Sequence, residues 1–347
     1  MWGMSETAQR LELRDRHGRV ARDLRVSLTD RCSLRCTYCM PADGMEWLAT
    51  ADVLSDAEVV RLIRIAVERL GVEEVRFTGG EPLLRRSLEE IVAATAGLRT
   101  ARGAAPATSL TTNGLGLSRR APGLRAAGLD RVNISLDAID PERYRTIARR
   151  DRVRDVIDGI DAAQAAGLAP VKVNTVLMRG VNEDQAVPLL RFALARGIQL
   201  RFIEQMPLGP RHTWDRRDFV SAPEILALLG AHFRLTAVAR DSVAAPAALW
   251  RVEPADGLPG GTVGVIASVS RPFCAACDRT RLTADGQLRT CLFARTETDL
   301  RTPLRSGASD EEIALIWAEA TWAKPAGHGI DDAGFVPPDR TMSAIGG

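Results

Sequence analysis

The sequence predicts an α/β fold: an incomplete, six-unit barrel of the TIM type, followed by a smaller C-terminal α+β extension. Segments rich in β-branched residues alternate with segments of helical periodicity over the first two thirds of the 347 residues. Several helical segments end in glycine, at Gly128, Gly167 and Gly197. Repeated strand-then-helix units favour a parallel sheet with right-handed crossovers. Six units are too few for a closed eight-fold barrel.

Six strands are expected in order along the chain, with helices between them. The expected strands span residues 24–29, 74–79, 108–113, 131–137, 171–178 and 200–206. The expected helices lie near residues 55–70, 87–98, 118–127, 153–166 and 182–196. Ser55 and Asn182 are the expected caps of the first and last of these helices.

Residues that could bind a ligand or take part in catalysis follow the ends of these strands. In barrels of this type, functional groups gather at the carboxyl ends of the strands. We therefore expect one opening to be faced by the residues at those ends, which are Cys32, Gly79, Gly80, Asn113, Asp137 and Met206.

The sequence changes character after about residue 210. Pro/Gly-rich stretches interrupt it, a short helix is expected at 222–229, and a strand at 262–270 leads into a second group of cysteines. We therefore expect three regions: an N-terminal arm, a barrel and an extension that packs on the barrel. Their boundaries are 1–22, 23–210 and 211–347.

Composition narrows the classes of function. The net charge is only +2, so a nucleic-acid or membrane partner is not expected. The N-terminus lacks the apolar core of a signal peptide, and no stretch approaches the roughly 18 apolar residues of a membrane span. A cytoplasmic location is therefore expected. Of the 46 basic residues, only Lys172 and Lys324 are lysines, which makes both worth attention.

The six cysteines fall into two groups of three. The first trio is Cys32, Cys36 and Cys39, and the second trio is Cys274, Cys277 and Cys291. Thiolates bind soft metals, and CxxC pairs indicate zinc or an iron-sulfur cluster. Zinc favours four protein ligands, whereas three thiolates on a cubane of four irons leave the fourth iron open to another ligand.

The spacing Cys32-x3-Cys36-x2-Cys39, directly after the first strand, resembles the signature of the radical S-adenosylmethionine (SAM) superfamily. The segment "TGGEP" at 78–82 resembles the glycine-rich segment of that superfamily. The resemblance implies a four-iron cluster whose open iron chelates SAM and which cleaves it to a 5′-deoxyadenosyl radical. It also implies four residues in contact with SAM, namely Tyr38, Gly80, Ser135 and Met206.

The second trio narrows the resemblance. Its spacing, Cys274-x2-Cys277-x13-Cys291, with "RTRL" after Cys277 and "CLFA" at Cys291, resembles the GTP 3′,8-cyclase family of molybdenum cofactor biosynthesis. Other matching segments are "DLRVSLTDRCSLRCTYCMP", "VRFTGGEPLLR", "RVNISLDAID", "VKVNTVLMRGVN" and "RFIEQMPLG". The resemblance implies a second four-iron cluster with an open iron. A structural zinc site completed by a residue such as His328 is the alternative.

The family resemblance also implies a substrate. Guanine of GTP would bind at the open iron of the second cluster, and cations at the barrel mouth would hold the triphosphate. Lys172 lies inside an apolar strand, where an inward charge needs an anionic partner. The implied GTP contacts are Arg25, Arg76, Thr111, Lys172, Arg279 and Arg281, of which Arg25, Arg279 and Arg281 are also candidates for a catalytic contribution.

The implied reaction is a radical lyase step. The deoxyadenosyl radical would remove the 3′ hydrogen of GTP, and the resulting carbon radical would attack carbon 8 of the same guanine. One electron and one proton would then give 3′,8-cyclo-7,8-dihydro-GTP. The chain's task would be positioning and enclosure. The paired glycines Gly346 and Gly347 resemble family glycines that reach into the active site.

Partners follow from the same resemblance. We expect an electron donor such as flavodoxin or ferredoxin, a downstream cyclic pyranopterin monophosphate synthase, and a homodimer. Two alternatives stay open on the sequence alone. One is another radical SAM enzyme with an auxiliary cluster, such as a peptide-modifying maturase, and the other is a zinc-binding module without catalysis.

Overall fold

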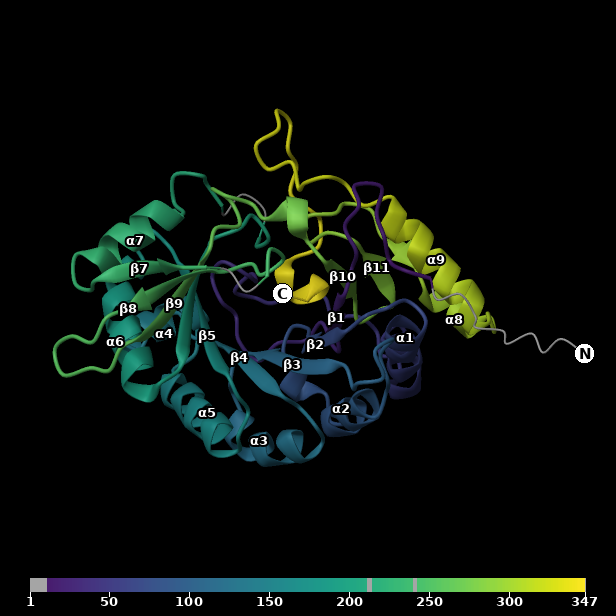
Figure 1. Cartoon of the computed structure of the whole chain (residues 1–347), viewed down its shortest axis with the longest axis horizontal. Coiled ribbons are helices and arrows are strands. Elements are labelled where there is room, and N and C mark those ends of the chain that lie inside the picture. Colours follow the sequence, from purple (N-terminus) through teal and green to yellow (C-terminus); the bar gives the residue numbers. More distant parts are fainter. Residues whose placement is uncertain (1–10, 211–213, 240–241, 347) are drawn as a thin grey trace, which may run out of the picture.

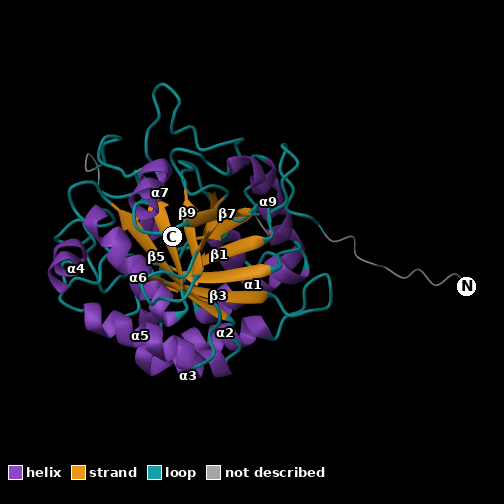
Figure 2. Ribbon diagram, turned by 60° about the vertical axis from the view of Figure 1, so that its left-hand side comes forward, coloured by secondary structure: helices purple, strands orange, loops and turns teal. Residues whose placement is uncertain are grey.

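A single twelve-stranded sheet organises the protein, with helices on its outer face (Figures 1 and 2). The computed structural model describes residues 11–210, 214–239 and 242–346. All six predicted strands are present and lie side by side, parallel and in chain order. They are β1 (Asp23–Ser27), β2 (Glu74–Thr78), β3 (Ala107–Thr112), β4 (Arg131–Ser135), β5 (Val171–Leu177) and β6 (Gln199–Glu204).

The helices between these strands cover the convex face of the sheet (Figure 2). Five were predicted, and a sixth, α4, was not. They are α1 (Asp56–Glu68), α2 (Leu88–Ala96), α3 (Leu117–Ala126), α4 (Pro141–Ala148), α5 (Val153–Ala165) and α6 (Ala186–Arg196). Gly128, Gly167 and Gly197 follow three of them with positive φ, as predicted.

One predicted helix cap is confirmed and the other is wrong. Ser55 and Glu58 form a capping box at the start of α1, in which each side chain accepts from the other's backbone N–H. Asn182 does not cap α6, which begins at Ala186. Its side chain instead accepts from Met178 N at 2.8 Å and donates to Asp137 O at 2.9 Å. It therefore ties the end of β5 to the end of β4.

The sheet does not close into a barrel, and the six-unit prediction had likewise excluded closure. Strands after residue 210 extend the sheet at both edges, so the extension is continuous with it. On one side β9 (Gly261–Ile266) pairs parallel with β6, and on the other β10 (Arg279–Leu282) pairs parallel with β1. Antiparallel strands then end each edge: β8 (Ala248–Val252) with β7 (Leu235–Val238), and β11 (Gln287–Arg289) with β12 (Thr298–Asp299).

The other C-terminal elements are helical. The predicted helix at 222–229 is α7 (Ala222–Gly230), while α8 (Arg301–Arg305), α9 (Asp310–Trp322) and α10 (Met342–Ile345) were not predicted. The last of these lies inside the curve of the sheet, with the described end of the chain (Figure 1). None of the helices within the described residues is long and apolar enough to cross a membrane.

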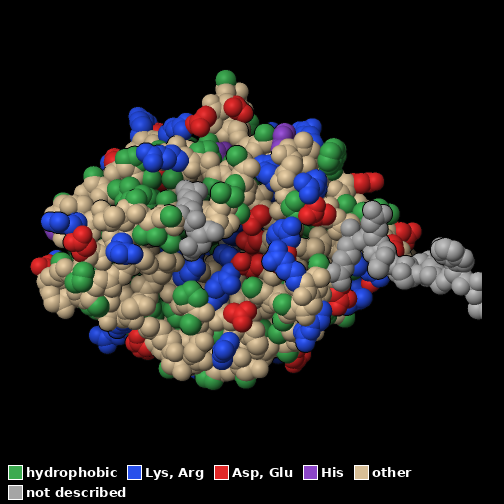
Figure 3. All heavy atoms as spheres, in the orientation of Figure 1, with side chains coloured by type: hydrophobic (Ala, Val, Ile, Leu, Met, Phe, Trp, Pro, Cys, Tyr) green, Lys and Arg blue, Asp and Glu red, His purple; other side chains and the backbone are tan. Residues whose placement is uncertain are grey.

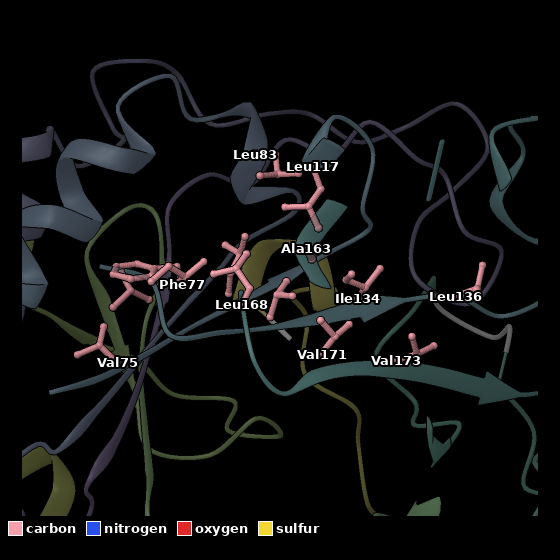
Figure 4. Packing of buried hydrophobic residues seen from close by; sticks show 14 of the residues in the cluster. Val75, Phe77, Leu83, Leu117, Ile134, Leu136, Ala163, Leu168, Val171 and Val173 are labelled. Atoms are coloured by element: carbon pink, nitrogen blue, oxygen red, sulfur yellow. The ribbon is translucent and has the colours of Figure 1, made fainter. Parts of the chain in front are cut away.

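Along each strand, side chains that pack in the hydrophobic core alternate with side chains that face the concave side of the sheet. On β5, Val171 and Val173 are buried against the helices, while Lys172 and Asn174 between them are only half-buried. Successive side chains of a strand point to opposite faces, so Lys172 and Asn174 face the concave side. Figure 4 shows the packed apolar residues, which include Val75, Phe77, Leu83, Leu117, Ile134, Val171 and Val173.

Candidate active site

The first trio lies on the loop after β1, held in place by two glycines after β2. A Cβ on Gly80 would lie 2.4 Å from the carbonyl oxygens of Asp30 and Arg31, and one on Gly79 would lie 2.5 Å from Thr29 O. Gly80 N donates to Thr29 O at 2.7 Å. Only glycine permits this approach, so "TGGEP" fixes the start of the cysteine loop.

The first trio faces a cavity of about 200 Å³ at the carboxyl ends of the strands. The six strand-end residues predicted to face one opening all line it, which confirms that prediction. So do the four residues that the resemblance assigns to SAM, and Thr111. The lining includes Cys32, Cys36, Cys39, Tyr38, Gly79, Gly80, Thr111, Asn113, Ser135, Asp137 and Met206.

Two buried carboxyl groups shape this cavity. The Tyr38 hydroxyl donates to Asp137 Oδ2 at 2.8 Å, and Val176 N donates to Oδ1 at 2.9 Å. Burial raises the pKa of Asp137 to about 6. Glu81 accepts from Thr112 Oγ1 at 2.6 Å and Asn113 N at 2.7 Å, and burial raises its pKa to about 7. Sequence reasoning did not single out Glu81.

Asn113 connects Glu81 to the first trio, because its backbone N donates to Glu81 and its side chain lies beside Cys32. Its Nδ2 lies 3.7 Å from Cys32 Sγ and donates to Ser33 Oγ at 3.0 Å. Burial raises the pKa of all three thiols, that of Cys39 to about 12. The nearby carboxylates Glu81 and Asp137 add to this effect at Cys32 and Cys36 respectively. Without a metal, the three thiols therefore favour their protonated forms, and a metal would bind by displacing those protons.

The second trio is positioned by the hairpin of β10 and β11. Cys274 lies in a 3₁₀ turn that ends just before β10, Cys277 precedes β10, and Cys291 follows β11. The three line a narrow cavity of about 70 Å³ together with Arg279 and Arg281. Met206 lines this cavity and the first one, so the two trios face adjoining spaces.

His328 does not complete the second trio. Its Nδ1 accepts from Ile330 N at 3.1 Å, and its Nε2 lies 3.1 Å from Ser268 O, so both ring nitrogens are occupied. All six cysteines are free of disulfides. Within the described residues, no three His, Cys, Asp or Glu side chains are arranged to hold a single metal ion.

A buried carboxylate that sequence reasoning also missed, Glu204 at the end of β6, anchors the segment leading to Cys274. Both of its oxygens accept hydrogen bonds: from Ala222 N at 2.7 Å, Val269 N at 2.8 Å, and Ser270 N at 2.7 Å. The Ser270 hydroxyl donates to it as well. Glu204 is fully buried, so one carboxylate fixes both this segment and the start of α7.

Cations surround the second trio. Burial alone would raise the pKa of the Cys277 thiol, but Lys324 and Arg279 outweigh it and the pKa is lowered. Burial, followed by the charge of Arg279, lowers the pKa of Arg281 to about 10. Arg19 of the N-terminal arm donates to Cys274 O at 2.7 Å and to Ala326 O at 2.8 Å, which holds the 3₁₀ turn from outside.

A row of arginines crosses the concave face of the sheet between the two trios. Arg25 is in register with Arg76 on one side and Arg281 on the other. Asp23 lies below them, 3.9 Å from Arg25, 3.9 Å from Arg76 and 3.5 Å from Arg279. Burial would raise the pKa of Asp23, but these arginines lower it. Glu74 also pairs with Arg76, at 2.7 Å, so two carboxylates face these four arginines.

This surplus of positive charge leaves the arginines only partly satisfied. The Nε atoms of Arg25, Arg76 and Arg279 are buried without a hydrogen-bond partner among the described residues. Burial, reinforced by Arg76 and Arg281, lowers the pKa of Arg25 well below its usual value. Lys and Arg side chains are visible in the central hollow of Figure 3. The arrangement fits a polyanionic ligand.

Lys172 does not lie beside either cysteine trio. It lines neither trio's cavity but a larger one of about 1010 Å³, near the amino ends of β5 and β6. Arg201, which was not predicted, shares this cavity and donates to Asn174 Oδ1 at 2.9 Å and Asn133 Oδ1 at 2.7 Å. Burial and the neighbouring arginines lower the pKa of Lys172 to about 8 and that of Arg201 to about 9.

The C-terminal tail enters the interior between the two cavities. Arg281 Nη1 donates to Gly346 O at 2.9 Å, and Ser343 lines the first cavity. A Cβ on Gly346 would lie 2.1 Å from Ser27 Oγ and 2.5 Å from Thr78 Oγ1, and its φ is +85°. A glycine is therefore required here. Gly347 lies outside the described residues.

Two family models match consecutive parts of the chain, and curated relatives match nearly all of it. A model of the radical SAM superfamily matches residues 26–193, and one described as Molybdenum Cofactor Synthesis C matches residues 198–330. The "GTP 3′,8-cyclase" of Corynebacterium glutamicum is 62% identical over 334 residues, covering 96% of this chain and 89% of that one. The "GTP 3′,8-cyclase" of Streptomyces coelicolor is 61% identical over 334 residues, covering 96% of each.

Solved structures share the fold at low sequence identity. The crystal structure of Streptococcus suis SuiB bound to S-adenosylmethionine is 13% identical, with a TM-score of 0.59. A second crystal structure of Streptococcus suis SuiB is 14% identical, with a TM-score of 0.61. Each match covers 90% of this chain and 68% of SuiB.

Proposed function

The chain belongs to the GTP 3′,8-cyclase family of radical SAM enzymes, and from this premise we propose how its residues convert GTP to 3′,8-cyclo-7,8-dihydro-GTP. This reaction is the first step of molybdenum cofactor biosynthesis. The non-catalytic zinc module and the peptide maturase are therefore not retained. The observation that carries the proposal is that two trios of free cysteines face adjoining cavities, with only partly compensated cations beside them.

SAM and an iron-sulfur cluster belong to this family's chemistry, and the first trio fits both. Three thiols without a fourth protein ligand match a four-iron cluster with an open iron. The cluster and SAM, when bound, supply the one-electron chemistry that starts the reaction. Tyr38, Gly80, Ser135 and Met206 are the proposed SAM contacts, since they line the same cavity as the thiols.

A second four-iron cluster at the second trio is proposed on the same grounds. Cys274, Cys277 and Cys291 line one narrow cavity, and His328 makes its hydrogen bonds elsewhere. The cavity also contains Arg279 and Arg281, which could hold GTP beside the cluster. The Met206 boundary between the cavities would bring the two ligands next to each other.

The arginine row is the proposed site for the charged part of GTP. Arg25 and Arg76 have unpaired Nε atoms, and arginine forks bind phosphate oxygens bidentately. Lys172 would add a compact charge at the far end of this site, because it is electrostatically coupled to Arg76 and Arg201. Thr111, in register with Asn133 on β4, adds a hydroxyl on the same concave face.

Enclosure is the chain's main contribution to the radical chemistry. A carbon radical is quenched by any nearby hydrogen donor, so bulk solvent and mobile side chains must be excluded. The tail contributes a residue without a side chain at Gly346, bound to Arg281. Arg25, Arg279 and Arg281 are the proposed catalytic contributors, since Arg279 and Arg281 line the second trio's cavity and Arg25 lies beside Arg281 in the sheet.

The further partners are proposals from the family resemblance. They are a low-potential electron donor such as flavodoxin or ferredoxin, a downstream cyclic pyranopterin monophosphate synthase, a homodimeric state and a cytoplasmic location. The test of function is anaerobic incubation of the reconstituted protein with GTP, SAM and dithionite. We expect a cyclised nucleotide and 5′-deoxyadenosine in equal amounts. Cleavage of SAM without cyclised nucleotide would contradict the proposal.

A further inference from the structure

Lys324, one of the chain's two lysines, is buried against the second trio. It lies just after α9, and its residue is only 3% exposed. Its Nζ donates to Cys277 O at 3.0 Å and Arg279 O at 2.9 Å, and it lies 3.5 Å from Cys277 Sγ. An ammonium has three donors, and these three acceptors match them. The side chain is therefore fully used within this site.

The charge of Lys324 has no carboxylate partner. Among the described residues, no aspartate or glutamate forms an ion pair with it. A buried ammonium without a counter-charge is strongly unfavourable, because desolvation is not repaid by neutral carbonyl groups alone. The remaining neighbour is the sulfur of Cys277. A four-iron core held by three thiolates is an anion, and reduction makes it more negative.

The position of Lys324 is held from both sides. Trp317 on α9 is fully buried, and its Nε1 donates to the Thr280 hydroxyl of β10 at 3.1 Å. On the other side, Arg19 donates to Pro325 O at 2.6 Å and also binds Cys274 O. Because helix, strand and arm converge here, Lys324 cannot move away from Cys277 without disrupting these contacts. The ammonium is a fixed charge.

We propose that Lys324 is a positioning residue that sets the reduction potential of the cluster at the second trio. Its ammonium donates to the Cys277 sulfur and supplies the counter-charge of the cluster. The inference rests on the second cluster of the proposed function. A fixed cation favours the more negative, reduced form, so it raises the potential. No comparable cation touches a sulfur of the first trio among the described residues.

The test measures the second cluster alone. In a protein with Cys32, Cys36 and Cys39 replaced by alanine, only the second trio can bind iron. Redox titration followed by electron paramagnetic resonance then gives its potential in three forms: Lys324, Lys324→Met and Lys324→Arg. For Lys324→Met we expect about a tenfold lower reduced-to-oxidised ratio at a fixed potential, or about 59 mV for a one-electron couple. Lys324→Arg retains the charge and should shift the potential less.

The outcomes separate the inference from the proposed function. If the parent protein with the second trio alone binds no iron, the second cluster is refuted, and the inference fails with it. If Lys324→Met binds four irons with an unchanged potential, the tuning role is refuted while the cluster stands. Loss of iron from both Lys324→Met and Lys324→Arg would make Lys324 a folding residue and overturn the proposal. A lowered potential in the methionine variant alone would support it.

Discussion

Each cysteine trio offers three thiols, but the charged groups around the two trios differ. Carboxyl groups flank the first trio, where Glu81 and Asp137 add to the effect of burial on the thiol pKa values. Cations flank the second, where Lys324 and Arg279 lower the pKa of Cys277, while burial raises that of Cys274. The ligand set alone therefore does not determine what each site does.

The difference assigns a task to each trio. Burial beside carboxyl groups disfavours an added electron, so a cluster at the first trio would be a strong reductant, as cleavage of SAM requires. Cationic surroundings stabilise added negative charge, so a cluster at the second trio would suit a site that holds a polyanionic substrate. Each trio also has a buried carboxylate that fixes nearby backbone, Glu81 for the first and Glu204 for the second.

Removing one thiol from each trio should separate the tasks most strongly. We expect Cys36→Ala to abolish SAM cleavage and cyclisation together. Cys277→Ala should abolish cyclisation but retain SAM cleavage, because the first trio stays intact. Iron analysis should give about four irons per chain in either variant, against about eight in the parent. The measurement is 5′-deoxyadenosine and cyclised nucleotide in the same anaerobic reaction. Equal loss of both products in Cys277→Ala would contradict the division of tasks.

The tail provides the next largest effect, because it bridges the two cavities without holding either cluster. We expect Gly346→Ala to reduce cyclisation by at least about 100-fold, since its Cβ would lie 2.1 Å from Ser27 Oγ. Deletion of residues 346–347 should have the same effect. Iron content should stay at the parent level. Gly307→Ala is the matched control for a positive φ, because nothing lies near its Cβ. A Gly346→Ala variant with parental cyclisation would remove the tail from the mechanism.

The sequence allowed the six central strand and helix units to be predicted, because their signals are local. Alternation, caps and terminal glycines mark each unit. Even α4 had a signal that was overlooked, since Asp140 caps it and Pro141 opens it. The joining of β10 to β1 and β9 to β6 has no such local signal. It depends on which strands, distant in the sequence, pair at the edges of the sheet. Because β10 pairs with β1 and β9 pairs with β6, the extension is continuous with the sheet.

The candidate site was predictable where spacing carries the chemistry. The cysteine trios, Gly80 and Tyr38 stand in short motifs, and the ends of parallel strands bring them together. Arg201, Glu204 and Asp23 were missed because an isolated charged residue in a sequence gives no sign that it is buried. Lys324 was noticed as a rare lysine, but its contact with Cys277 depends on how α9 packs on β10.

A variant of Glu204 should weaken the backbone contacts that position the second trio. We expect Glu204→Gln to destabilise the metal-free protein by about 3 kcal/mol, because the amide nitrogen would face backbone donors in a buried site. It should also lower iron at the second trio selectively. Glu224→Gln is the matched control on α7, where an exposed capping residue should cost about 1 kcal/mol or less. Urea unfolding and iron analysis are the measurements. Loss of iron from the first trio instead would contradict the assignment.

The smallest expected effect concerns Lys172, which lies away from both trios. Its pKa of about 8 means that the ammonium is mostly protonated at pH 7 and mostly neutral at pH 9. A triphosphate favours the protonated form, so affinity for GTP should be constant well below pH 8 and fall above it. Between pH 7.5 and 8.5 we expect the Kd to rise roughly threefold, as one group with this pKa dictates. Lys172→Arg should remove this dependence, because a guanidinium keeps its charge across the range. Equilibrium binding of GTP to the anaerobic protein measures the effect. A parallel pH profile in the parent and in Lys172→Arg would show that the triphosphate is held by the arginine row alone.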